Sequence, residues 1–299
     1  MLEAPVAHSR HLRGAAANLN VDILDENGEP ADASGTLTVG ITKADGTELL
    51  AAGSSTTNPT GTGSYTRALT VAQTATLDIL TATWTDSTDS STLITVHEIV
   101  GGYYFTLAEA RAADATLADA ARHDDTGLQA TRRDVEEEFE AICAVAFVPR
   151  YRRVRLDGDG TARLLIPDPL PRTLRSVRVY SDATTYTSFT AAEIAAVTLP
   201  SNGVIERTDG GVWAYGRQNL VLEYEHGHDR PPAEIKRAAI ARARQRLRLG
   251  NSGLPDRTET FTSNEFGAFR LATAGRDRVG TDWIDAALAR HSERIPGLA

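Results

Sequence analysis

The chain has 299 residues, of which 41% are hydrophobic and 24% are charged, a composition typical of a globular protein with a buried core. Its length allows two or three domains, no apolar run of about 18 residues could span a membrane, and a single cysteine, Cys143, excludes an intrachain disulfide. The net charge of −9 arises entirely in residues 1–110, which hold 13 acidic and 4 basic residues. We expect this acidic part to repel nucleic acid, whereas the neutral, arginine-rich remainder suits ion pairs with a protein partner.

The first hundred residues predict strands. Residues 1–17 show no clear periodicity and are expected to form a flexible arm, or an arm that orders on a neighbouring subunit. Residues 18–100 alternate apolar and polar side chains in about six or seven short runs separated by turns such as DENGEP (25–30), which predicts an antiparallel β-sandwich. Trp84 is the expected core residue, and Gly101–Gly102 is the expected hinge to the next domain.

Helical periodicity begins near residue 105. Thr106 and Glu109 have the spacing of a capping box, and the helix that they open is expected to run to about Arg122. Its Ala-rich sequence favours a helix intrinsically.

A second helix is expected after Asp124–Asp125, and Pro149 is expected to stop it. The charged run RRDVEEE (132–138) lies on its polar face. Its apolar residues have helical spacing and share the other face, and they are Leu128, Val135, Phe139 and Ile142.

Strands return in a predicted β-insert of about residues 151–227. DGDG (157–160) is interpreted as a hairpin turn, since the further ligands and the closing Glu of a calcium loop are missing. A third helix, 231–249, opens on two prolines and ends at Gly250.

The C-terminal tail, residues 251–299, is rich in loops and carries a short helix that begins near Thr281. The whole chain is therefore predicted to be an α+β multidomain protein: the arm, the sandwich, a helical domain over residues 105–250 interrupted by the β-insert, and the extended tail.

The residues that could carry chemistry have simpler structural interpretations. HGHD (226–229) lacks a third clustered metal ligand, so we predict a strand-to-helix turn. Cys143 is predicted to be a buried small side chain rather than a nucleophile, and His97 and Glu98 point to opposite faces of a strand. No nucleophile elbow, dinucleotide fingerprint or P-loop occurs. We therefore predict no enzyme activity, no cofactor and no metal.

Arginine residues crowd the third helix, and acidic residues crowd the second. Contact with nucleic acid is one interpretation, but the third helix has no aromatic residue to stack on bases, and the chain is acidic overall. Arg–carboxylate pairs, either between helices or between subunits, are favoured instead. The residues assigned to such intersubunit contacts are Arg132, Arg133, Glu136, Glu137, Glu140, Arg237, Arg242, Arg244 and Arg246.

Three segments carry a resemblance: RRDVEEEFEAICAVAFVPR (132–150), RRVRLDGDGTARLLIPDPLPRTLRSVRV (152–179) and LVLEYEHGHDRPPAEIKRAAIARARQRL (220–247). Together they resemble the head-tail adaptor (connector) proteins of long-tailed double-stranded DNA bacteriophages. In that family a strand that ends in a Gly turn leads through P-x-x-[IL]-K-x-A into the third helix. The matching residues are Pro232, Ile235, Lys236 and Ala238.

Two further segments extend the resemblance. TETFTSNEFGAFRLATAGRDRVGTDWIDAALARH (258–291) resembles adaptors of actinobacterial phages in particular. GSYTRALTVAQTATLDILTATW (63–84) resembles immunoglobulin-like domains attached to phage structural proteins. Shorter family members lack this N-terminal domain, and the resemblance leaves its role open.

The resemblance implies a structural virion protein of the neck, assembled in the host cytoplasm and not in a membrane. It implies a ring of this chain, expected to be a dodecamer, that joins the portal protein to a tail-side stopper or neck protein. DNA would pass through the ring without sequence-specific binding. The tail would contact the portal, through Phe261, Phe266, Phe269, Arg270, Arg276, Trp283, Ile284 and Leu288.

Two other classes of protein remain open. A virion or cell-surface glycan-binding protein acting through the sandwich would need exposed aromatic residues on its loops. The aromatic residues near there mostly fit core or hinge positions, and they are Tyr65, Trp84, Tyr103, Tyr104 and Phe105. A hydrolase with an unusual site is the third class.

Overall fold

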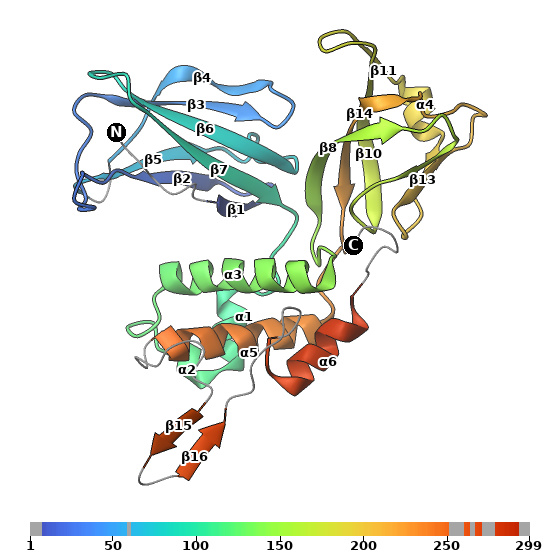
Figure 1. The fold of residues 1–299 in the computed structure, drawn as a ribbon. Coiled ribbons are helices and arrows are strands. Elements are labelled where there is room, and N and C mark those ends of the chain that lie inside the picture. Colours follow the sequence, from blue (N-terminus) through green and yellow to red (C-terminus); the bar gives the residue numbers. More distant parts are fainter. Residues whose placement is uncertain (1–7, 59–60, 251–259, 264–266, 271–278, 293–299) are drawn as a thin grey trace. The chain divides into compact units, whose positions relative to one another are not determined.

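The computed structural model describes residues 8–58, 61–250, 260–263, 267–270 and 279–292, and its fold is α+β. The chain divides into two compact units. The β unit comprises Met1–Gly102, Pro149–Ile166 and Leu170–Gly227, and the helical unit comprises Tyr103–Val148, Pro167–Pro169 and His228–Ala299. The β-insert therefore shares a unit with the N-terminal strands rather than with the helices that it separates in sequence. Figure 1 labels the helices and strands of both units. No helix of the described residues is long and apolar enough to cross a membrane.

The N-terminal strands form a five-stranded sheet of order β1-β7-β6-β3-β4 and a two-stranded sheet, β2-β5. Their bounds are β1 (His8–Leu12), β2 (Ala17–Asp22), β3 (Leu37–Lys43), β4 (Glu48–Ser55), β5 (Ser64–Leu69), β6 (Asp78–Asp86) and β7 (Thr92–Val100). The expectation of a flexible arm is wrong for its second half, because β1 pairs in parallel with β7 from His8↔Val96 to Leu12↔Val100. Residues 1–7 lie outside the described residues.

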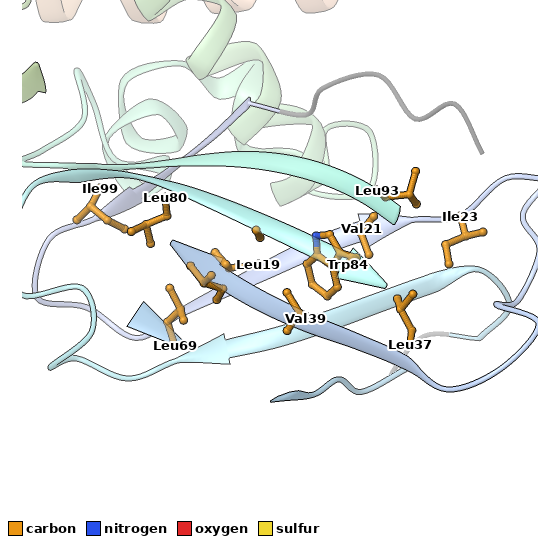
Figure 2. Close-up of a cluster of buried hydrophobic side chains, with 12 residues drawn as sticks. Leu19, Val21, Ile23, Leu37, Val39, Leu69, Leu80, Trp84, Leu93 and Ile99 are labelled. Carbon is orange, nitrogen blue, oxygen red and sulfur yellow. The ribbon is translucent and has the colours of Figure 1, made fainter. Parts of the chain in front are cut away.

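A hydrophobic core joins these two sheets, as Figure 2 shows. Leu19 and Val21 of β2 contribute to it from the smaller sheet, and Val39 and Trp84 contribute from the larger one. Trp84 is fully buried, and its indole N–H donates to Thr95 Oγ1 at 2.9 Å. The predicted core role of Trp84 is confirmed.

The β-insert contains a four-stranded sheet of order β11-β10-β14-β8 and a three-stranded sheet, β12-β13-β9. Its elements are β8 (Arg150–Gly158), β9 (Arg163–Leu165), β10 (Pro171–Tyr180), β11 (Tyr186–Ser188), α4 (Ala191–Ala195), β12 (Val197–Thr198), β13 (Val204–Arg207) and β14 (Gly216–His226). The predicted hairpin around residues 157–160 is wrong: β8 pairs with β14 and β9 pairs with β13. The turn instead passes the chain from one sheet to the other, and buried Trp213, Leu220 and Leu222 belong to the cluster that joins them.

Gly101 lies where the chain leaves the N-terminal strands. Its N–H donates to the carbonyl oxygen of Pro149 at 2.8 Å, and a Cβ built on Gly101 would lie 2.6 Å from Pro149 Cβ. Arg150 and Glu98 also form an ion pair at this junction. Glycine at position 101 therefore permits a close approach of two segments. The boundary between the two units falls directly after Gly102, so the expected hinge stays a prediction.

The helical unit contains α1 (Leu107–Ala113), α2 (Ala115–Ala118), α3 (Asp125–Cys143), α5 (Ala233–Gly250), β15 (Thr260–Ser263), β16 (Gly267–Arg270) and α6 (Asp282–Arg290). The capping box of Thr106 and Glu109 is confirmed. The first helix ends earlier than predicted, because Asp114 is extended and its carboxylate caps a new turn at Thr116. Likewise α3 ends at Cys143, where Ala144 takes a left-handed conformation (φ 55°), before Pro149 is reached.

The buried face of α3 is confirmed for Leu128, Val135 and Phe139, which are fully buried. Cys143 is buried as predicted, and Ile142 is only half-buried. Cys143 lies four residues after Phe139, so it continues the i, i+3, i+4 stripe.

Candidate interaction surfaces

Helices α3 and α5 pack against each other within one chain (Figure 1). Arginine residues of α5 meet acidic residues of α3 at this contact. Arg242 donates Nε and Nη2 to the two carboxylate oxygens of Glu138, at 2.9 and 2.7 Å. Arg246 lies 3.3 Å from Glu138 and 3.7 Å from Asp134. The interhelix alternative is therefore confirmed for Arg242 and Arg246, and these guanidinium groups already have carboxylate partners in their own chain.

Two further pairs connect α5 with the first helical segment. Arg244 Nη1 lies 2.8 Å from Asp114 Oδ2, and Lys236 Nζ lies 2.7 Å from Glu109 Oε1. The hydrogen bond from Lys236, helped by the amide of Thr106, lowers the pKa of Glu109 to about 2. Because the side chains of Glu109 and Lys236 both remain open to solvent, this pair contributes little to stability.

Arg132, Glu136 and Glu140 were expected at the intersubunit surface, and the structure places them against the segment that enters α1. Arg132 is buried, its guanidinium lies 3.5 Å from the centroid of the Tyr103 ring, and it donates to the carbonyl of Phe105. Glu136 is 1% exposed and accepts from the amide of Tyr104 at 2.9 Å.

The physical reason for this burial is helical spacing. Arg132 lies four residues after Leu128, and Glu136 lies four residues after Arg132, so both fall along the apolar stripe of α3. Glu140, half-buried, accepts from the hydroxyl of Tyr104 at 3.3 Å. The charge of Arg132 and Glu136 predicts an exposed position on α3. Both side chains are buried instead, because they lie along the apolar stripe of the helix.

The other intersubunit candidates are more open to solvent. Arg133 is half-buried and lies 3.4 Å from Asp134. Glu137 of α3 and Arg237 of α5 are exposed, and neither has a hydrogen-bond or ion-pair partner in the part of the chain that the structure describes. These two opposite charges are available to another molecule.

In the C-terminal tail, α6 packs against α5 and α3. Ile284 and Leu288 are buried there, and Leu288 O lies 3.5 Å from Cys143 Sγ. Trp283 is 50% exposed. Thr281 precedes the helix as predicted, but the carboxylate of Asp285 holds the turn before it, by accepting the amides of residues 279 and 280.

The remaining tail candidates lie partly outside the described residues. Phe261 of β15 pairs in backbone register with Phe269 of β16, and Arg270 pairs with Thr260. Phe266 and Arg276 lie outside the described residues. Among the tail candidates whose side chains are described, only Trp283 is substantially exposed, since Ile284 and Leu288 are buried in their own unit.

The clusters with metal-like composition are parts of turns. Asp157 accepts the amide of Gln218 and Asp159 accepts that of Thr161, which agrees with a turn at 157–160. After His226 ends β14, Gly227 takes a φ of +95° and leads toward α5, as the predicted strand-to-helix turn requires. The described residues contain no group of three or more His, Cys, Asp or Glu side chains that could hold a metal ion.

A histidine cluster that the sequence does not predict lies between β1 and β7, with His97 buried and His11 half-buried. His97 Nε2 lies 2.7 Å from Thr95 Oγ1, and His97 Nδ1 lies 3.3 Å from His11 Nε2, with Ser9 Oγ hydrogen-bonded to both rings. Burial lowers the pKa of His11 to about 4. Glu98 contacts Arg150 instead, so the predicted opposite orientation of His97 and Glu98 is confirmed. The only sequence signal for the cluster was the period-2 spacing of Ser9 and His11, in a segment assigned to the arm.

Exposed aromatic residues are scarce in the N-terminal strands. The large apolar side chains that are exposed in the described part of residues 8–100 are Leu12, Val71 and Ile94. Tyr65 is half-buried, and its hydroxyl accepts from the amide of Ala33. The feature that a glycan-binding sandwich would need is therefore not seen in these residues.

Comparisons with known proteins give limited similarity. No protein-family model matches the chain, and no curated protein matches it. Solved structures that are similar include a chain of the neck of an empty gene transfer agent particle (17% identity, TM-score 0.41, covering 52% of this chain and 83% of that one). A chain of the native gene transfer agent virion has 17% identity and a TM-score of 0.44. The match covers 65% of this chain and 92% of that one. A chain of the native neck, computed with C12 symmetry, has 17% identity and a TM-score of 0.38. The match covers 53% of this chain and 88% of that one. TM-scores below 0.5 at this identity do not establish a shared function.

Proposed function

We propose that this chain is a structural virion protein of the head-tail adaptor type, which forms a ring between the portal and a tail-side neck protein and lets DNA pass. The observation that carries the proposal is the junction between β14 and α5. The strand ends at His226, Gly227 takes the left-handed conformation, and two prolines precede Ala233, the first residue of α5. This is the strand–glycine–helix order that the sequence resemblance implies.

The residues of the matching pattern have structural roles that fit this junction. Ile235 and Ala238 are fully buried in the helical unit, and Lys236 pairs with Glu109. The element order of α3, β-insert and α5 also follows the order that the resemblance implies. The proposal includes no catalytic step and no cofactor.

We assign attachment to the portal to Trp283. Half of its side chain is exposed, whereas the neighbouring Ile284 and Leu288 hold α6 on its own unit. A large aromatic residue on a helix that is already fixed can bury apolar surface on a partner at small entropic cost. The remaining exposed part of this helix carries polar and small residues.

We assign contact between neighbouring subunits of the ring to Glu137 and Arg237. A closed ring is built from a head-to-tail contact, in which two different surfaces of one chain meet. Exposed charges of opposite sign on α3 and α5, without a partner among the described residues, supply two such surfaces. The expected ring is a dodecamer, and each contact recurs in every interface.

The test is reconstitution with the portal protein of the same particle, followed by electron microscopy and a binding measurement. The wild-type chain should form a ring on the portal. Trp283→Ala should weaken binding by about thirtyfold, the effect of losing a hot-spot aromatic residue of ~2 kcal/mol, with an unchanged circular dichroism spectrum. Val71→Ala is the matched control, because Val71 is 55% exposed and lies in the β unit.

Charge reversal tests the ring contact in the same assay. Glu137→Arg and Arg237→Glu should each reduce the fraction of closed rings, and the chain with both changes should recover them. Absence of any complex between the wild-type chain and the portal would refute the proposed function. Unaltered binding by Trp283→Ala would refute the assigned anchor alone.

A further inference from the structure

One end of the β-insert holds a tyrosine on a fixed loop. Tyr215 is 86% exposed, the highest value among the large hydrophobic side chains of the described chain. The preceding Ala214 is fixed, because its carbonyl accepts from Asn219 Nδ2 at 2.9 Å while Asn219 Oδ1 accepts from the amide of Gly158 at 3.0 Å. A Cβ on Gly158 would lie 1.8 Å from the oxygen of Ala214, so the sequence at 158 is constrained by this loop. The buried Asn219 thus orders a segment whose most prominent side chain points into solvent.

Further tyrosine and arginine residues lie at the same end of the four-stranded sheet. The rings of Tyr180 and Tyr186 pack with centroids 5.2 Å apart, and Tyr186 is 45% exposed. The guanidinium of Arg155 lies 4.7 Å from the Tyr180 ring and donates to the carbonyl of Gln218. Arg217 is exposed, and it has no partner among the described residues. We name this surface the tyrosine–arginine end, comprising Arg155, Tyr180, Tyr186, Tyr215 and Arg217.

The carboxylates of this region are directed to backbone groups. Asp157 accepts one backbone amide at 2.6 Å, Asp159 accepts another at 2.9 Å, and Asp182 accepts two amides in its own turn. Within the described chain, the guanidinium groups of Arg155 and Arg217 therefore have no carboxylate partner and can receive an anion from outside. The three aspartates disfavour a polyanion such as a phosphate backbone more strongly than they disfavour two single carboxylates that pair with these guanidinium groups.

A complementary surface exists on the same chain. The turn at residues 25–32 carries four exposed acidic residues. Asp25 and Asp32 accept backbone amides, whereas the side chains of Glu26 and Glu29 have no partner within the described residues. This turn belongs to the part of the chain, residues 1–110, that holds the acidic excess. Tyr and Arg on one surface and available carboxylates on another form the two halves of a head-to-tail contact.

We propose that the tyrosine–arginine end of one copy of this chain binds the acidic turn, residues 25–32, of a second copy. Arg155 and Arg217 would pair with Glu26 and Glu29, and Tyr215 would cover the turn. The inference rests on the self-association part of the proposed function and deepens it, but it does not involve the portal. It adds a contact in the β unit to the one assigned in the helical unit.

The test is sedimentation velocity of the full chain over a wide range of concentration, without portal. The wild type should self-associate reversibly. The variants R155E/R217E and E26R/E29R should each raise the Kd by about tenfold or more, since attraction becomes like-charge repulsion. The chain carrying all four reversals should recover association. R122E/R230E is the matched control, because both of these arginines are exposed and lie outside the two surfaces.

Three results would overturn the inference: a wild-type chain that stays monomeric at every concentration, association unchanged in R155E/R217E, or no recovery in the fourfold variant. A single- or double-stranded DNA oligonucleotide that binds the wild type and not R155E/R217E would assign the surface to nucleic acid, which also overturns it. A chain that self-associates as expected but does not bind the portal would refute only the proposed function.

Discussion

Acidification should release β1 from β7, and His11 should be the group responsible. His11 lies 3.0 Å from Ser9 and 3.3 Å from His97, and burial lowers its pKa from 6.5 to about 4. In the released strand His11 is solvated and regains its ordinary pKa, so the released state binds more protons between pH 6.5 and 4. The stability of the attached strand is therefore constant above pH 6.5, decreases as the pH falls through that window, and levels off below pH 4.

The size of the effect follows from the pKa difference. A pKa difference of one between the attached and the released strand corresponds to about 1.4 kcal/mol, which is a tenfold change in the equilibrium constant for opening. Between about pH 6.5 and 4.5 the free energy of opening should fall by about 2.2 kcal/mol, and the protection of the β1 amides should fall by about fortyfold.

Hydrogen exchange followed by mass spectrometry on a peptide covering residues 8–14 measures this directly, after correction for the intrinsic rates. His11→Asn removes the titrating group and keeps a polar side chain, so its protection should change little over the same pH range. The neighbouring ion pair of Arg10 and Glu98 is retained in both proteins. Equal pH dependence in the wild type and His11→Asn would show that a group other than His11 controls the release of β1.

Two other predictions concern the helical unit. A double-mutant cycle of Arg242→Ala and Glu138→Ala should give a coupling of about 1 kcal/mol in thermal unfolding, because the pair is bidentate and both side chains are less than one-fifth exposed; a coupling of zero would contradict it. Glu136→Ala should destabilise the unit by about 1–3 kcal/mol, since it leaves the buried amide of Tyr104 without its acceptor. Glu136→Gln, which retains a carbonyl oxygen, should cost less in urea denaturation, and equal losses would count against this explanation.

Features that depend on neighbours along the chain can be predicted from the sequence. The capping box of Thr106 and Glu109 is satisfied within one turn, and α6 begins after Thr281. The buried face of α3 followed from spacing alone, because helical periodicity fixes which residues share a side. The predicted core position of Trp84 is confirmed, because a large apolar ring on the inward face of an alternating strand is stabilised by burial.

Features that depend on contacts between distant segments become visible only in the folded chain. The segment at residues 8–12 has only the spacing of Ser9 and His11 as a strand signal, and it becomes β1 because it pairs with the edge of β7. The turn at 157–160 looks like a hairpin, but β8 finds its partner in β14, far along the chain. Charge suggested that Arg132 and Glu136 lie at a surface, yet both are buried, because the Tyr103–Phe105 segment supplies a ring, a carbonyl and an amide to receive them. Folding brings such partners together from distant parts of the chain, so a local sequence pattern cannot predict these contacts.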